Sequence, residues 1–146
     1  MSITLCAVAL GGCGRTLSPA ELQSLGKHVF PGRKRREVVQ AATVALKTLG
    51  YEVVVSDATS GQVKTAPKPL VVTAVGTGTS AVAVSNELAW SLEVSNASEG
   101  AVVQATPRAI SGGQSYDGPF DADYMEKSFA DLWKEIESNL PKKSGG

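Results

Sequence analysis

Hydrophobic residues recur at two different spacings along this chain, and these spacings predict helices and strands. From Val38 onward, apolar residues fall every three or four positions, which is the period of an α-helix. The positions concerned are Val38, Val39, Ala42, Ala45, Leu46 and Leu49. Gly50 follows directly and suits the left-handed end of such a helix. We therefore predict a helix rich in small residues that ends at Gly50 and can approach a sheet closely.

A second long helix is predicted near the C-terminus by the same spacing. Its apolar residues are Met125, Phe129, Leu132, Ile136 and Leu140, with Trp133 beside them. Asp121 is placed to cap the first turn, and Pro141 is placed to end the helix. A shorter helix is expected from Ser18, because Pro19 and Glu21 complete the pattern of a capped helix start.

Alternation of apolar and polar residues predicts strands between the two long helices. The clearest strand is Glu87–Ser95, whose apolar positions are Leu88, Trp90, Leu92 and Val94. Further strands are expected over residues 27–30, 51–56, 62–66, 70–75, 81–84 and 101–106, and a loop over 110–118. This order predicts an α+β fold: an antiparallel sheet of four to five strands packed on one face by two helices, as β-α-β-β-β-β-α. The length favours a single domain over residues 27–140, with a disordered tail over 141–146.

Charge and hydropathy narrow the class of partner. Lys and Arg number 14 and are balanced by 14 Asp and Glu, so the formal net charge is zero. A protein that binds nucleic acid normally shows a basic excess, so we expect no nucleic-acid partner. No apolar run in the sequence approaches the roughly 18 residues that a transmembrane helix needs.

The first residues form a short apolar run that ends in a cysteine. Ile3–Leu10 is too short to span a bilayer and suits the core of a signal peptide, although residues 1–5 carry no Lys or Arg. The following Leu10-Gly11-Gly12-Cys13 resembles the lipobox of bacterial lipoproteins. The resemblance implies a signal peptide over residues 1–12, palmitate-type acyl chains on Cys13, and a lipidated tether with a short helix over residues 13–26. Several acyl chains give stable membrane anchoring, whereas a single chain binds only marginally.

The same resemblance implies a location in the bacterial cell envelope. Gly14 follows Cys13, and in enterobacterial lipoproteins a residue other than Asp at that position directs the protein to the outer membrane, facing the periplasm. The alternative reading of the N-terminus is a buried strand or helix in which Cys6 and Cys13 are ordinary core residues. Neither reading predicts a disulfide or a cysteine metal site, because the spacing of Cys6 and Cys13 matches no such motif.

Four consecutive cations precede the first long helix: Arg33, Lys34, Arg35 and Arg36. Such a run is usually a solvated face, and we favour that interpretation. However, positive charge at a helix N-terminus opposes the helix dipole. This small cost suggests a second interpretation, in which the four side chains contact an anion such as a lipid headgroup.

Candidate catalytic chemistry is sparse. His28 is the only histidine, so triads and metal sites built on several histidines are impossible, and a lone histidine near a strand end is usually structural or exposed. Asp117, Asp121 and Asp123 cluster, but they lack the Gly and the terminal Glu of a calcium loop, and turn or helix-cap roles explain them better. We therefore expect no enzymatic activity, no metal and no cofactor.

The order of elements is similar to small envelope lipoprotein domains, including the helix-grip domains of accessory lipoproteins in outer-membrane assembly complexes. The similarity covers Lys27 to Leu140 and rests on ALKTLGYEV…SGQV, ELAWSLEVSN…GAVV and FADLWKEIESNL. It implies a non-catalytic, lipid-anchored interaction or scaffold module with an envelope protein as partner. The alternative is a carrier or sensor of a small amphiphilic ligand held between helix and sheet, with Ala42, Ala45 and Ala105 as candidate lining residues. Close packing of helix on sheet is the simpler explanation of these alanines.

Overall fold

The computed structural model describes residues 15–75, 82–111, 114–116 and 120–142. The predicted hairpin turn at Gly76–Thr79, together with Cys6, Cys13 and Asp117, lies outside these ranges. The elements in chain order are β1 (Thr16–Leu17), α2 (Pro19–Leu25), β2 (Lys27–Pro31), α3 (Arg35–Thr48), β3 (Val53–Asp57), β4 (Gln62–Thr65), β5 (Lys68–Val75), β6 (Val82–Ala97), β7 (Gly100–Ser111), β8 (Gln114–Tyr116), β9 (Phe120–Asp121) and α4 (Ala122–Asn139).

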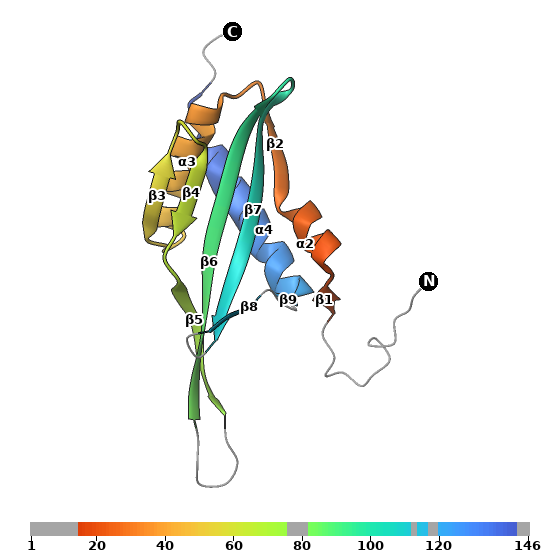
Figure 1. Ribbon diagram of the computed structural model, residues 1–146, viewed down its shortest axis with the longest axis vertical. Coiled ribbons are helices and arrows are strands. Elements are labelled where there is room, and N and C mark those ends of the chain that lie inside the picture. The colour runs from red at the N-terminus through yellow and green to blue at the C-terminus, as the bar shows by residue number, and fades with distance from the viewer. Residues whose placement is uncertain (1–14, 76–81, 112–113, 117–119, 143–146) are drawn as a thin grey trace, which may run out of the picture.

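One antiparallel sheet is built around the long strands β6 and β7 (Figure 1). The strand order is β2-β7-β6-β4-β3, while β5 pairs with β6 and β8 pairs with β7. The α+β class predicted from the sequence is confirmed. Within the described residues, the sheet holds seven strands rather than four or five. Residues 81–84 and 87–95 were predicted as separate strands, but the single 16-residue strand β6 runs from Val82 to Ala97.

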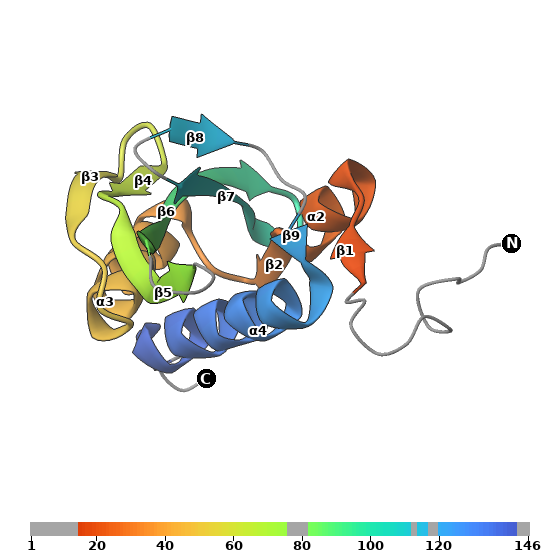
Figure 2. The same ribbon diagram turned by 90° about the horizontal axis from the view of Figure 1, so that it is seen from below.

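The hydrophobic core lies between the sheet and two helices. Figure 2 shows α3 and α4 on the same side of the curved sheet. The largest fully buried side chains come from both layers: Phe30, Val38, Val39, Leu46, Val63, Leu88, Leu92, Val103, Met125, Phe129, Leu132 and Ile136. The apolar positions predicted for the two long helices and for residues 87–95 supply most of this core, which confirms the spacing argument.

The predicted helix ends are also observed. The Ser18 hydroxyl accepts from the Glu21 backbone N–H, and the Glu21 carboxylate accepts from the Ser18 backbone N–H, forming a capping box. The Asp121 carboxylate caps α4 by accepting from the Tyr124 N–H at 2.8 Å. Gly50 has a φ of 95°, the left-handed conformation expected after α3.

Two regions differ from the sequence prediction. Residues 13–26 were expected to form a tether, but β1 pairs with β9 and Leu17 is buried, so the part from residue 15 is packed on the body. Residues 110–118 were expected as a loop, but β7 continues through Pro107 to Ser111 and β8 pairs back onto it.

Candidate functional site

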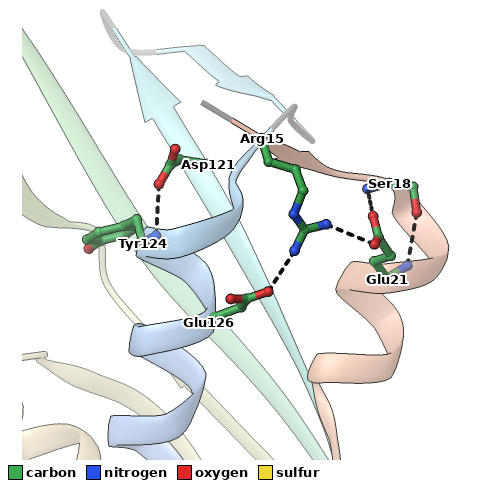
Figure 3. A network of polar contacts seen from close by, with 6 residues as sticks. All are labelled: Arg15, Ser18, Glu21, Asp121, Tyr124 and Glu126. Atoms are coloured by element: carbon green, nitrogen blue, oxygen red, sulfur yellow. Dashed lines mark hydrogen bonds and ion pairs between the residues drawn. The ribbon is translucent and has the colours of Figure 1, made fainter. Parts of the chain in front are cut away.

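The N-terminal segment is held at the start of α4 by one arginine. Arg15 donates to the carboxylates of Glu21, at 3.0 Å, and Glu126, at 2.7 Å (Figure 3). It thereby links the segment to both α2 and α4. The Ser18 backbone N–H, followed by the Ser18 hydroxyl and Arg15, lowers the pKa of Glu21, so the carboxylate is ionised at neutral pH. These contacts attach the chain to α2 and α4 at Arg15, which is two residues after Cys13 in the sequence.

The four cations of the basic run do not share one environment. The Arg33 guanidinium is largely buried, donates to the Pro141 carbonyl at 2.5 Å and lies 4.0 Å from the Glu37 carboxylate. Arg35 is half-buried, and its backbone N–H donates to Asn96. Lys34 and Arg36 are exposed. The Glu37 carboxylate accepts from the Lys34 backbone N–H, which offsets part of the unfavourable charge at this helix start.

Beside the register pair Trp90–Pro107, the described strands on the outer side of β6 and on the outer side of β7 are both interrupted. On the β4 side of β6, the Trp90 N–H donates to the Thr65 hydroxyl at 2.9 Å, because β4 ends there and β5 begins only at Lys68. On the far side of β7, β2 pairs no further than Gln104 and β8 pairs from Ala109. No described strand therefore pairs with residues 106–108 along that edge.

Pro107 lies at this edge and is itself buried. The Ala105 N–H donates across the edge to Gly26 at 2.7 Å, so the backbone nitrogen of Pro107, two residues further on, faces the same way. Proline has no N–H, so the gap presents carbonyl acceptors and no exposed donor at this point. Proline is tolerated because its register partner Trp90 donates to Thr65, away from β7.

A groove follows the open edge between α2 and β7. It has a volume of about 460 Å³, and we call it the seam. The seam is lined by Pro19, Leu22, Gln23, Gln104, Ala105, Thr106, Pro107 and Phe120. Gln104 Nε2 donates to the Gln23 carbonyl at 3.2 Å and bridges the two walls. The groove thus combines apolar walls with the edge of β7, where the Ala105 carbonyl accepts from Gln104 Nε2 at 3.5 Å.

An aromatic cluster holds α2 and β2 in place beside the seam. Trp133 on α4 donates from Nε1 to the Leu25 carbonyl at the end of α2, at 3.2 Å. The His28 ring stacks on Trp133 with centroids 4.9 Å apart and contacts Phe30 at 4.6 Å. Burial lowers the pKa of His28, against an opposing effect of Glu137, so the imidazole is a neutral packing group. The structural role expected for this lone histidine is observed.

The alanines proposed to line a ligand cavity are packed instead. Ala42, Ala45 and Ala105 are at most 1% exposed and belong to the core. A hollow of about 240 Å³ does lie between α4 and the sheet, beside Tyr51, Trp90 and Tyr124. Its cations are engaged: Lys68 donates to the Leu49 carbonyl at 2.7 Å, and Lys127 to Asp131 at 2.9 Å.

Sequence reasoning missed the seam, although Pro107 gives a signal. A proline within an alternating strand pattern marks an edge position, and this one lies between Ala105 and Ala109, both buried. Of the predicted acidic cluster, Asp121 caps α4 and Asp123 lies in its first turn. Within the described ranges, no group of three or more His, Cys, Asp and Glu side chains could hold a metal ion.

The arrangement defines an α+β domain with one edge groove. No protein-family model and no curated protein matches the chain. Among solved structures, the crystal structure of a DUF4468 family protein from Bacteroides ovatus ATCC 8483 is similar with a TM-score of 0.45. It has 9% sequence identity, over 82% of this chain and 86% of that chain. In the described part of the chain, no helix is long and apolar enough to cross a membrane.

Proposed function

We propose that this chain is a non-catalytic interaction module, anchored to the bacterial envelope membrane through lipid on Cys13, that binds a protein partner in the seam. The observation that carries the partner site is the seam beside residues 106–108 of β7, with which no described strand pairs. Unpaired strand edges are sites at which other chains add main-chain hydrogen bonds. In this role the domain would be an accessory subunit of an envelope complex, on the periplasmic side of the outer membrane.

The seam limits what a partner can insert. Residues 106–108 are too few to pair with a full strand, so the partner contributes a short segment. An apolar side chain fits against Leu22 and Phe120, while a backbone N–H of the partner donates to the Pro107 carbonyl. Because the edge offers no donor at Pro107, a partner group that can only accept gains nothing there.

The geometry of the N-terminus supports close anchoring. Only Gly14 separates Cys13 from the clamped Arg15, so a lipid on Cys13 would hold the body within about 7 Å of the anchored residue. The basic run lies at the other end of α4, because Arg15 contacts Glu126 whereas Arg33 contacts Pro141. The part of α4 between Glu126 and Asn139 is about 20 Å long. The basic run thus lies too far from the anchored end to support contact with headgroups of the same membrane. Anion binding stays a prediction for the exposed Lys34 and Arg36.

Metabolic labelling with palmitate tests the anchor. The unmodified chain is expected to take up label and the Cys13→Ala chain to take up none, whereas Cys6→Ser leaves the labelling unchanged. Equal labelling of the unmodified and Cys13→Ala chains would remove the lipoprotein part of the proposal.

Site-specific photocrosslinking in the native envelope tests the seam. A benzoylphenylalanine at Gln23, exposed on α2, is expected to give a light-dependent adduct with a partner protein. The matched position is Val44, which is 47% exposed on α3 and distant in the sequence from the seam. Adducts of equal yield at both positions, or none at Gln23, would contradict a partner site in the seam.

A carrier of a small amphiphile is the second candidate. The hollow beside Tyr51 and Tyr124 favours it, but its volume of about 240 Å³ is below the range of roughly 300–1,000 Å³ typical of ligand pockets. The packed alanines leave no described cavity at the predicted place, so we rank the carrier below the interaction module.

A further inference from the structure

A second depression lies on the face of the sheet opposite α3 and α4, next to the seam. It has a volume of about 320 Å³, and we call it the outer hollow. It is lined by Val54, Lys64, Thr65, Ala89, Trp90, Ser91, Thr106, Pro107 and Arg108. Thr106 and Pro107 also line the seam, so the two depressions meet across β7.

Strand register explains how the outer hollow forms. Lys64, Ser91 and Thr106 are side by side on β4, β6 and β7, and Ala89 pairs with Arg108 in the next row. Side chains directly opposite one another share a face of the sheet. Small residues at Ala89 and Ser91 therefore leave a depression on β6 between two longer cationic side chains. The β3 register shifts at Val54, which is 57% exposed and adds an apolar wall.

The outer hollow is electrostatically suited to an anion. Among the described residues, neither Lys64 nor Arg108 has a carboxylate within 4.0 Å. The hydroxyls of Ser91 and Thr106 add donors between the two cations. Three carboxylates share the face by register but do not line the outer hollow: Asp57 and Glu93 both pair with Gln62, and Glu87 pairs with Ile110.

We propose that the seam and the outer hollow together bind one extended peptide segment of the partner, with an apolar side chain in the seam and an acidic side chain in the outer hollow. This inference rests on the proposed function and specifies the partner's chemistry. The path from the seam, beyond β7, to Ser91 on β6 crosses about two strand spacings, or roughly 10 Å. An extended peptide covers that distance in about three residues, so the acidic residue follows or precedes the apolar one by three positions.

Peptide titration of the full chain, followed by backbone amide NMR, tests this inference. The probes are the capped peptides Ac-Leu-Ser-Gly-Glu-NH2 and Ac-Leu-Ser-Gly-Gln-NH2, together with versions that have one, three or four residues between Leu and Glu. At 20 mM salt, the Glu peptide is expected to shift the amides of Leu22, Gln23, Ala89 and Ser91. It should bind more tightly than the Gln peptide, by up to about five-fold, as expected for a contact between exposed charges.

Paired substitutions locate the charge effect. The double variant Lys64→Gln, Arg108→Gln is expected to abolish the preference for the Glu peptide. The control double variant Lys134→Gln, Lys142→Gln removes the same amount of charge from α4 and the residues after it, and it should leave the preference intact. Raising the salt concentration to 300 mM should also reduce the preference, because exposed charges are then screened. Glu93→Gln removes a neighbouring carboxylate and should tighten binding of the Glu peptide.

The outcomes separate the two proposals. If both peptides shift the seam amides equally and leave Ala89 and Ser91 unchanged, the acidic-segment inference is wrong and the seam remains a partner site. If the Glu peptide shifts only Ala89 and Ser91, the outer hollow binds anions but the joint site is wrong. If no peptide in the spacing series shifts either set, or if the double variant keeps the preference, the inference is overturned.

Discussion

Replacing Ala45 with Leu decides between a packed interface and an internal ligand cavity. Ala45 is fully buried on the face of α3 that packs on the core, and the alternative carrier hypothesis would place it in the wall of a cavity. Leucine adds three carbon atoms at this position. If helix and sheet are closely packed there, these atoms force neighbouring side chains from their rotamers, at a cost of about 1–3 kcal/mol in free energy of unfolding.

The opposite sign is expected if open space lies beside Ala45. Three buried methylene-sized groups would then stabilise the fold by up to about 2 kcal/mol, at roughly 0.8 kcal/mol each. Because 1.4 kcal/mol corresponds to a tenfold change in the equilibrium constant, urea unfolding followed by circular dichroism resolves the two cases.

The matched control is Ala130→Leu, which makes the same replacement at an exposed position of α4. It is expected to change the free energy of unfolding by no more than about 0.5 kcal/mol. An Ala45→Leu chain as stable as the unmodified protein, or more stable, would refute the packed interface and favour the carrier over the interaction module.

Three further predictions concern His28, Asp121 and Gly61. The lowered pKa of His28 means that the unfolded chain takes up a proton near pH 6.5 before the folded chain does, so stability is complete above that pH and falls as the pH drops below it. His28→Phe keeps a ring against Trp133 and should show a smaller loss between pH 7.5 and 5.5 in urea midpoint; an undiminished loss would assign it to other groups. Asp121→Ala removes the cap of α4 and should cost about 0.5–2 kcal/mol in the same assay, whereas Asp121→Asn keeps a capping oxygen and should cost less. Gly61 has a φ of 79°, and an added Cβ would collide with the Val94 carbonyl, so Gly61→Ala should cost about 2–4 kcal/mol; a change below about 1 kcal/mol would show that the turn relaxes freely.

The sequence predicted those parts of the fold that depend on local periodicity. Leu88, Trp90, Leu92 and Val94 alternate over a strand that is buried on one face, and each is at most 3% exposed. The caps at Ser18 and Asp121 follow from side chains that bond backbone groups three residues away, so sequence alone identifies them.

The sequence did not reveal features that depend on distant pairing. Two-residue strands such as β1 and β9 carry no periodic signal, and their pairing joins segments about 100 residues apart. The strand over residues 101–106 was predicted to end just before Pro107, a residue type that is disfavoured where a strand has partners on both sides. The strand continues because the edge at Pro107 has no described partner, and that depends on where β2 ends and β8 begins.

The outer hollow was equally inaccessible from sequence. Lys64 and Arg108 are 44 positions apart, and only the register of β4, β6 and β7 brings them to one face. Charge composition, which is balanced overall, gives no indication that two cations converge around Ser91 and Ala89.

The clamp at Arg15 would have a mechanical consequence if the chain is anchored at Cys13, as we propose. Between Arg15 and Leu25, the segment is held by exposed ion pairs, the two-residue β1–β9 pairing, a short helix and the Trp133 contact at its end. A pulling force on the N-terminus reaches these weak contacts one after another, before it reaches the main sheet. Peeling off these residues would lengthen the tether by roughly 35 Å at full extension, with the core intact. The domain would then lie farther from the membrane surface and reach partners that are out of range when Arg15 is clamped. The salt-sensitive Arg15 contacts would determine how readily this extension occurs.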